Sequence, residues 1–149
     1  MFSVHHVAIV VADIEKAKAF YEGLGANLVK QSELNSPNEI LEKLTGLSDI
    51  GAKIILMKCA NVFIEIFEFS RSQGSLDNNR ANMLGIRHIA LETDDIDKLM
   101  NTVKGLGGSV LGEIVKVPGA ASAVYCVDPF GNILELIHPG GAMPALGEL

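Results

Sequence analysis

Long hydrophobic runs are missing from this chain of 149 residues, although 48% of its residues are hydrophobic. Charged residues or histidines interrupt every apolar stretch before it reaches the ~20 residues that a membrane-spanning helix needs. The N-terminus also lacks the basic segment and the long apolar segment of a secretory signal. We therefore expect no membrane partner and a cytoplasmic location.

Basic residues and cysteines are also few. The chain has 12 lysines and arginines against 18 aspartates and glutamates, which gives a formal charge of −6. It shows no basic stripe that could neutralise the phosphates of a nucleic acid, so we expect no nucleic-acid partner. The two cysteines, Cys59 and Cys126, are far apart and form no C-x-x-C motif. This pattern favours reduced, buried thiols over a disulfide.

An internal repeat organises the rest of the sequence. Val4–Ile14 aligns without gaps with Ile86–Ile96, at a spacing of 82 residues. The offset pairs His6 with His88, Ala8 with Ala90, Asp13 with Asp95, Ile14 with Ile96 and Gly25 with Gly107. Each copy therefore predicts a strand, a helix capped by aspartate, and a glycine where the helix ends.

Strand-like stretches follow both helices. They are expected at 27–31, 53–58 and 61–67 in the first copy, and at 109–112, 121–127 and 133–137 in the second. The sequence thus predicts an α+β fold of two βαβββ modules, at 1–69 and 85–139, with a polar linker at 70–84 and a tail at 140–149. An insertion at 32–50 contains a possible short helix at 38–45, on the surface or over a pocket, with the surface favoured.

Alternation within the strands separates two faces of each sheet. In the first strand His6 and Ala8 share one face, while bulkier residues such as Val7 occupy the face expected under the helix. The equivalent strand repeats this arrangement with His88 and Ala90. A small alanine beside each histidine leaves room for something other than protein side chains.

The last strand of each copy carries one carboxylate among large apolar residues, Glu65 in the first and Glu135 in the second. Burying an isolated carboxylate costs several kcal/mol, so a cation, a hydrogen-bond network or exposure at a sheet edge must compensate. Two sheets curled around a two-fold axis would bring these carboxylates together with His6 and His88. The set predicts a centre for one divalent metal ion, with Zn, Fe, Ni, Co or Mn compatible with the imidazole and carboxylate donors.

Two further histidines were weighed as ligands. Strand parity and the repeat both select His6 over His5, which is then a helix-side or edge residue. His138 follows the last strand and is expected to be exposed, or to lie at the mouth of a pocket. Tyr125 is either a pocket residue or a strand aromatic with its hydroxyl at the surface.

These motifs resemble the vicinal-oxygen-chelate superfamily, which includes glyoxalases, bleomycin-resistance proteins and extradiol dioxygenases. The matching segments are His6–Ile14, Ile64–Ile66, His88–Ala90, Asp128–Asn132 and Glu135–Leu136. The resemblance implies that the two modules form a curved mixed sheet around the metal, and it places His6, Glu65, His88 and Glu135 at the family's four ligand positions. It further implies a small-molecule substrate that binds through adjacent oxygens, and a homodimer.

The expected chemistry is that of a lyase or isomerase acting through a metal-stabilised enolate. Glu135, or else Glu65, is the expected catalytic base, because a carboxylate that loosens from the metal in a dry site can move a proton at neutral pH.

Two alternatives stay open. The stretch Val124–Gly131 resembles the latter half of the signature of Fe(II) extradiol-type dioxygenases, although Lys116, Val117 and Pro118 occupy the region where those enzymes carry a histidine. A drug- or metabolite-sequestering resistance protein is the other alternative. Such members typically lack several of the metal ligands, whereas this sequence has all four.

Overall fold

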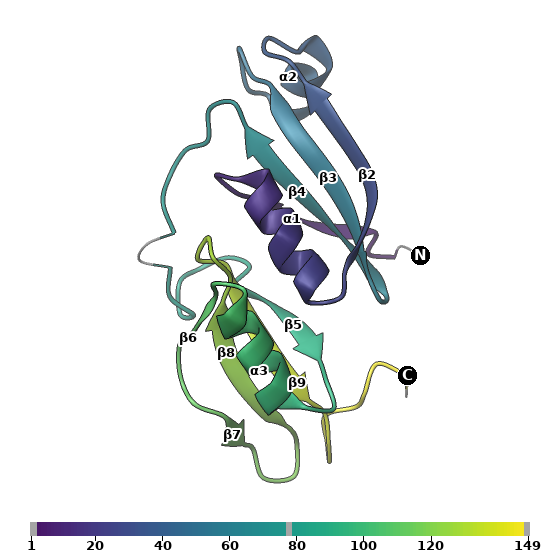
Figure 1. Cartoon of the computed structure of the whole chain (residues 1–149), viewed down its shortest axis with the longest axis vertical. Helices are drawn as coiled ribbons and strands as arrows, with labels where there is room; N and C mark the ends of the chain where they lie inside the picture. Colours follow the sequence, from purple (N-terminus) through teal and green to yellow (C-terminus); the bar gives the residue numbers. More distant parts are fainter. Residues whose placement is uncertain (1–2, 77–78, 148–149) are drawn as a thin grey trace. The chain divides into compact units, whose positions relative to one another are not determined.

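The computed structural model of the chain describes residues 3–76 and 79–147 (Figure 1). Its internal contacts divide the chain between Gly74 and Ser75 into two compact units, which are described separately here as unit 1 and unit 2. Nine strands and three helices lie within the described residues, in two separate sheets. The expected α+β class, with one module repeated twice, is confirmed.

Unit 1 follows the predicted order of elements. They are β1 (His6–Val10), α1 (Ile14–Gly23), β2 (Asn27–Leu34), α2 (Glu39–Thr45), β3 (Ala52–Cys59) and β4 (Val62–Phe69). The strands lie in the order β1-β4-β3-β2, with β1 parallel to β4 and the other neighbours antiparallel. The first strand of the module is therefore an edge strand beside the last one.

Unit 2 repeats this plan with a shorter second edge. Its elements are β5 (His88–Glu92), α3 (Ile96–Gly105), β6 (Ser109–Val110), β7 (Val115–Lys116), β8 (Ser122–Val127) and β9 (Ile133–His138). The order is β5-β9-β8-β6, and β7 also pairs with β8. The pair β5–β9 is parallel, as β1–β4 is in unit 1.

The predicted helix signals act in both units. The side chain of Asp13 accepts a hydrogen bond from the backbone N–H of Lys16, and Asp95 accepts one from Lys98. These bonds satisfy amide groups that the helix itself leaves free. Just past each helix, Gly25 and Gly107 have φ angles of +99° and +90°, a conformation that glycine adopts without a Cβ clash.

Each helix covers one face of its own sheet, as Figure 1 shows for α1 and α3. In unit 1 the buried side of α1 contacts β3 and β4, and the side chains beneath it are almost fully buried. They include Phe20 and Tyr21 from the helix and Met57, Ile64 and Ile66 from the strands. In unit 2 the equivalent core is built from Val103, Val124, Cys126, Leu134 and Leu136. The opposite face of each sheet, which carries the other strand parity, is left more open.

The insertion of unit 1 forms the expected short helix. Asn38 caps α2 through a hydrogen bond from the N–H of Leu41, and Gly46 ends it with φ of +73°. The favoured surface position holds only for its outer side, where Ile40 is 77% exposed. Leu41, at 2% exposure, anchors the helix in a small cluster with Ile50.

Most predicted strand bounds differ from the structure by one or two residues, and the most consequential differences lie at the second edge of each sheet. β2 continues to Leu34 instead of ending at Gln31, because β3 offers backbone partners over this whole length. The strand expected at 109–112 ends at Val110, and a second short strand follows at Val115–Lys116. Both pieces pair with β8, so the chain leaves the sheet and returns.

The described residues contain no helix that is long and apolar enough to cross a membrane. The two cysteines are free: Cys59 is half-buried and Cys126 is buried. Burial raises the pKa of both thiols above their ordinary value, so both stay protonated at neutral pH.

Candidate metal centre

The histidine and glutamate of each unit lie on the face that its helix leaves uncovered. In unit 1 the register pairs Ala8 with Glu65, and His6 lies two residues before Ala8 on the same face. In unit 2 the register pairs Ala90 with Glu135, and His88 stands in the same relation. The alanine that the sequence placed beside each histidine is thus the direct neighbour of each glutamate.

In unit 1 the two side chains approach each other across β1 and β4. The Nε2 atom of His6 lies 3.4 Å from Oε2 of Glu65. The side chains are 41% and 26% exposed, so the pair is open to a ligand from the uncovered side. On the other side of Glu65, the register places Leu56 of β3.

In unit 2 the equivalent pair is closer and less exposed. The Nε2 atom of His88 lies 3.1 Å from Oε2 of Glu135, and the side chains are 34% and 19% exposed. Tyr125 of β8 is the register partner of Glu135 on its other side. The aromatic ring of Tyr125 lies 5.2 Å from the ring of His88, measured between centroids.

These separations fit a shared metal ion. Donor atoms that each lie about 2.1 Å from one ion are roughly 3.0 Å apart at octahedral and 3.4 Å apart at tetrahedral angles. The two pairs, at 3.1 and 3.4 Å, lie in this range. In each pair, an imidazole nitrogen and a carboxylate oxygen face one another, and both are donors that divalent ions accept. Each unit therefore presents two ligand atoms in a suitable arrangement.

His5 lies closer to the pair of unit 1 than strand parity indicated. Its Nδ1 atom is 2.9 Å from Nδ1 of His6, and its ring stacks on Phe63 of β4 at a centroid distance of 5.2 Å. The expectation of a helix-side residue is therefore wrong, while the alternative of an edge position holds. His5 precedes β1, so its side chain does not follow the alternation of the strand.

His138 and Tyr125 are also placed. His138 is exposed, as expected, and its Nδ1 lies 3.0 Å from the carbonyl oxygen of Thr93. Tyr125 is half-buried and lines a pocket of about 520 Å³, so the pocket alternative holds for it. No sequence signal paired Tyr125 with His88, because this contact depends on the register of β8 with β9 and of β9 with β5.

Tyr125 connects this pocket with the pair of unit 2, because its ring lies 5.2 Å from that of His88 and it is the register partner of Glu135. The pocket is lined by Asn79, Arg80, Ala81, Leu111, Gly112, Glu113, Val115, Ala123, Val124 and Tyr125. Its volume falls within the range of about 300–1,000 Å³ that small-molecule sites occupy. Asn79 holds one wall in place, because it donates to the carbonyl of Gly131 and accepts from Arg87.

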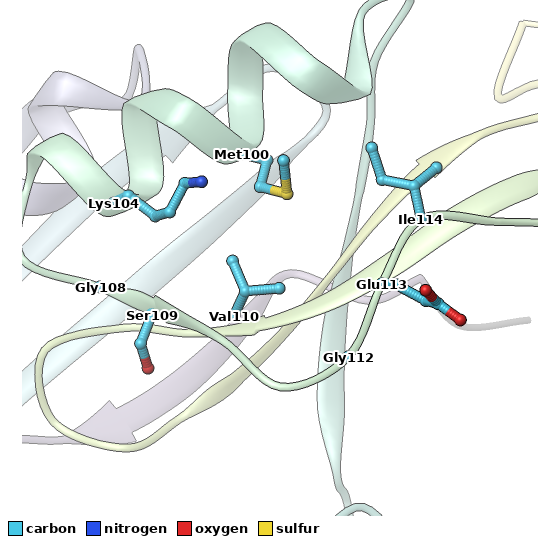
Figure 2. A pocket seen from close by; sticks show the side chains of 8 residues that line it. All are labelled: Met100, Lys104, Gly108, Ser109, Val110, Gly112, Glu113 and Ile114. Carbon is cyan, nitrogen blue, oxygen red and sulfur yellow. The ribbon is translucent and has the colours of Figure 1, made fainter.

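A second, larger pocket of about 690 Å³ lies on the helix side of the same sheet (Figure 2). Met100 and Lys104 of α3 form one wall, and Val110 of β6 faces them. The cross-strand partner of Val110 is Cys126, which is fully buried on the helix side. This pocket is therefore separated by the sheet from the face that carries His88 and Glu135.

Within residues 3–76 and 79–147, no three histidine, cysteine, aspartate or glutamate side chains surround one possible ion position. The structure brings His6 to Glu65 and His88 to Glu135. The convergence of all four side chains on one ion stays a prediction.

Comparison with known proteins agrees with the fold. Residues 3–136 match the family model described as the Glyoxalase/Bleomycin resistance protein/Dioxygenase superfamily. Among solved structures, a glyoxalase family protein from Bacillus cereus superposes with a TM-score of 0.85 at 23% identity, covering 95% of this chain and 96% of that one. The fosfomycin resistance protein FosX from Listeria monocytogenes, solved with Mn(II), gives a TM-score of 0.67 at 22% identity, with coverage of 95% and 93%.

Relatives of described activity are epimerases and a lyase. A 2-epi-5-epi-valiolone epimerase from Actinomyces sp is 29% identical, over 94% of this chain and 81% of its own length. An ethylmalonyl-CoA/methylmalonyl-CoA epimerase from Cereibacter sphaeroides is 34% identical, over 72% of this chain and 73% of its own length. A lactoylglutathione lyase from Arabidopsis thaliana is 26% identical over 91% of this chain, which spans 44% of that protein.

Proposed function

Since the chain belongs to the glyoxalase/bleomycin resistance protein/dioxygenase superfamily, we propose that it is a metal-dependent isomerase or lyase that moves a proton next to a carbonyl group. The observation that carries this proposal is the matched pair of facing side chains, His6 with Glu65 and His88 with Glu135, at 3.4 and 3.1 Å. The epimerases and the lyase among its relatives support the same class of chemistry.

The four side chains would hold one divalent ion. Two neutral imidazoles and two carboxylates balance the charge of such an ion, and none of the four is a thiolate that would favour Cu(I) or an iron–sulfur cluster. A bound ion would supply Lewis acidity for the negative charge that develops on adjacent substrate oxygens. Mn(II) in FosX shows that one protein of this fold is compatible with such an ion.

Glu135 is the proposed base. Its side chain is the more buried of the two glutamates, at 19% against 26% exposure, and it lies between the small Ala90 and the ring of Tyr125. A substrate in the pocket that Tyr125 lines would lie beside the cross-strand partner of Glu135. Glu65 would serve as the second carboxylate, which an epimerisation needs in order to return a proton from another direction.

The substrate is proposed to be a small molecule with two adjacent oxygens and a tail. The oxygens would face the histidine and glutamate side chains, and the tail would enter the pocket of about 520 Å³. Leu111, Val115 and Ala123 give this pocket apolar walls, while Arg80 and Glu113 add charges of both signs. We further propose a homodimer, as the resemblance implied.

The test is deuterium exchange in the presence of metal. Purified protein is loaded in turn with Zn, Fe(II), Ni, Co or Mn. Each sample is then incubated in D2O with acyl-CoA esters, cyclic polyol ketones and hemithioacetals. Mass spectrometry then measures the exchange of substrate C–H. Glu135→Gln is expected to slow exchange by about 100-fold or more, the usual contribution of a general base. Glu22→Gln, on the exposed side of α1, is the control.

Full exchange by Glu135→Gln would refute the assignment of the base, and protein that binds no divalent metal would refute the class of mechanism. A second candidate, an Fe(II) dioxygenase, is favoured by the ring of Tyr125 beside His88. Catechol-dependent uptake of O₂ by the Fe(II)-loaded protein, without deuterium exchange, would establish it in place of the isomerase.

A further inference from the structure

The two proposed histidine ligands differ in what lies behind them. Behind His6, at the ring nitrogen that faces away from Glu65, lies a second histidine: Nδ1 of His5 is 2.9 Å from Nδ1 of His6. The 82-residue offset places Arg87 at the corresponding position of unit 2. Arg87 donates to Asn79 instead. The contact is thus a property of unit 1.

Counting protons shows which of the two ring nitrogens carries the proton in this contact. Two ring nitrogens at 2.9 Å need one proton between them, so one ring donates and the other accepts. If Nε2 of His6 binds the ion, that nitrogen carries no proton, and the neutral ring keeps its proton on Nδ1. His6 must then donate, and His5 must accept through an unprotonated Nδ1.

We propose that His5 is a positioning residue that fixes the tautomer and the ring orientation of His6 for metal binding. This inference rests on the proposed metal centre. An outer partner on the second nitrogen of a ligating histidine holds the ring in place and makes the ligand more basic. The Nδ1 atom of His5 is used by His6, so that nitrogen is not a ligand in this arrangement.

The surroundings of His5 hold its ring where this role requires. The ring stacks on Phe63 with an angle of 23° between the planes, and it meets His6 edge-on at 89°. The ammonium group of Lys58 lies 4.4 Å from the centre of the Phe63 ring. The carbonyl of His5 accepts from the N–H of Phe63 at 3.4 Å, so the backbone is tied to β4 as well.

Two substitutions separate the hydrogen bond from the stacking. His5→Phe keeps an aromatic ring for Phe63 but cannot accept a hydrogen bond from His6. His5→Asn keeps an acceptor oxygen and gives up the stacking. His138→Ala, an exposed histidine of unit 2, is the control.

The first measurement is Zn(II) affinity by competition with a chromophoric chelator. His5→Phe is expected to weaken binding by about 10-fold, the lower end of the usual effect of an outer partner. His5→Asn should stay within about 3-fold of the wild type, and His138→Ala should be unchanged. Circular dichroism checks that each variant is folded.

The second measurement is the proton NMR spectrum of the Co(II)-loaded protein. Imidazole N–H protons of ligating histidines give shifted, exchangeable signals, and two are expected. In His5→Phe, the signal of His6 should broaden through exchange with water, while that of His88 stays sharp. A merely structural role would not change one signal alone.

The outcomes are distinct. Equal affinity and two sharp signals in His5→Phe would overturn the role of His5 and leave the metal centre intact. A wild-type protein without Zn(II) or Co(II) binding would overturn the metal centre, and the role of His5 with it.

Discussion

Units 1 and 2 carry the same pair of side chains in different surroundings. In both, a histidine on the first strand meets a glutamate on the last, with an alanine opposite the glutamate. The outer neighbours differ: His5 lies 2.9 Å from the histidine of unit 1, whereas the ring of Tyr125 lies against that of unit 2. The comparison teaches that the repeat places a facing histidine and glutamate in each unit, while the residues around each pair differ.

The second edges of the sheets differ in the same way. In unit 1, β2 pairs with β3 from Asn27 to Leu34, with one irregularity. In unit 2 the edge is broken between Val110 and Val115, and residues of this break line both pockets of the unit. The strand break thus contributes to both pockets of unit 2. We propose that the tail of the substrate enters the pocket lined by Tyr125.

The largest expected effect tests whether the two pairs serve one ion. His6→Ala and His88→Ala should each lower Zn(II) affinity by on the order of 100-fold or more, above the loss of an outer partner. The two losses should not be additive in the double variant, since both residues would bind the same ion. Calorimetric titration should give one ion per chain.

A different stoichiometry would break this interpretation. Two ions per chain, with each substitution removing one of them, would mean that the units bind metal independently.

The next largest expected effect is on the free energy of unfolding, at a repeat position where the two units carry different residues. Gly108 of unit 2 corresponds to the buried Ala26 of unit 1. A Cβ at Gly108 would lie 2.6 Å from the carbonyl oxygen of Val127 and 2.7 Å from Cγ1 of Val103. Gly108→Ala should therefore lower the free energy of unfolding by about 1–3 kcal/mol, as overpacking does.

Urea denaturation measures this change, with Gly112→Ala as the control because a Cβ there meets no atom within 4 Å. Equal stability of Gly108→Ala and the wild type would show that α3 can move away from its sheet at little cost.

The smallest expected effect is on stability and concerns the first residue of α1, whose N–H group is bound by Glu68. Glu68 of unit 1 accepts from the N–H of Ile14 at 2.7 Å and from Lys53 at 3.0 Å. It lies three residues after Glu65, and His138 lies three residues after Glu135 in unit 2. The hydrogen bond from Ile14, followed by that from Lys53, lowers the pKa of Glu68 below its ordinary value of 4.5. Glu68→Ala should cost about 1 kcal/mol at neutral pH, as the loss of a helix cap does.

The pH dependence follows from the sign of the shift. A depressed pKa in the folded state stabilises the fold above 4.5, and the contribution disappears as the pH falls through the folded-state pKa. Thermal unfolding of wild type and Glu68→Ala should therefore converge at acid pH. A constant difference down to pH 2 would contradict the charge-dependent part.

Much of this arrangement could be predicted from the sequence, because it depends on local periodicity. Strand parity gave the shared face of His6 and Ala8, and the aspartate and glycine signals gave the helix ends. The contacts of Tyr125 and His5 could not be predicted. The first depends on register across three strands, and the second on a residue outside the strand pleat. The break after Val110 also depends on long-range pairing with β8.

The alanines opposite the two glutamates have a consequence for engineering. Ala8 and Ala90 leave space next to the carboxylates, because each projects only one methyl group from the sheet. Exchange for glycine would enlarge this space and exchange for valine would reduce it, and neither would change the histidines or the glutamates. Under the proposed function, the size of the substrate could thus be changed separately from the affinity for the metal ion.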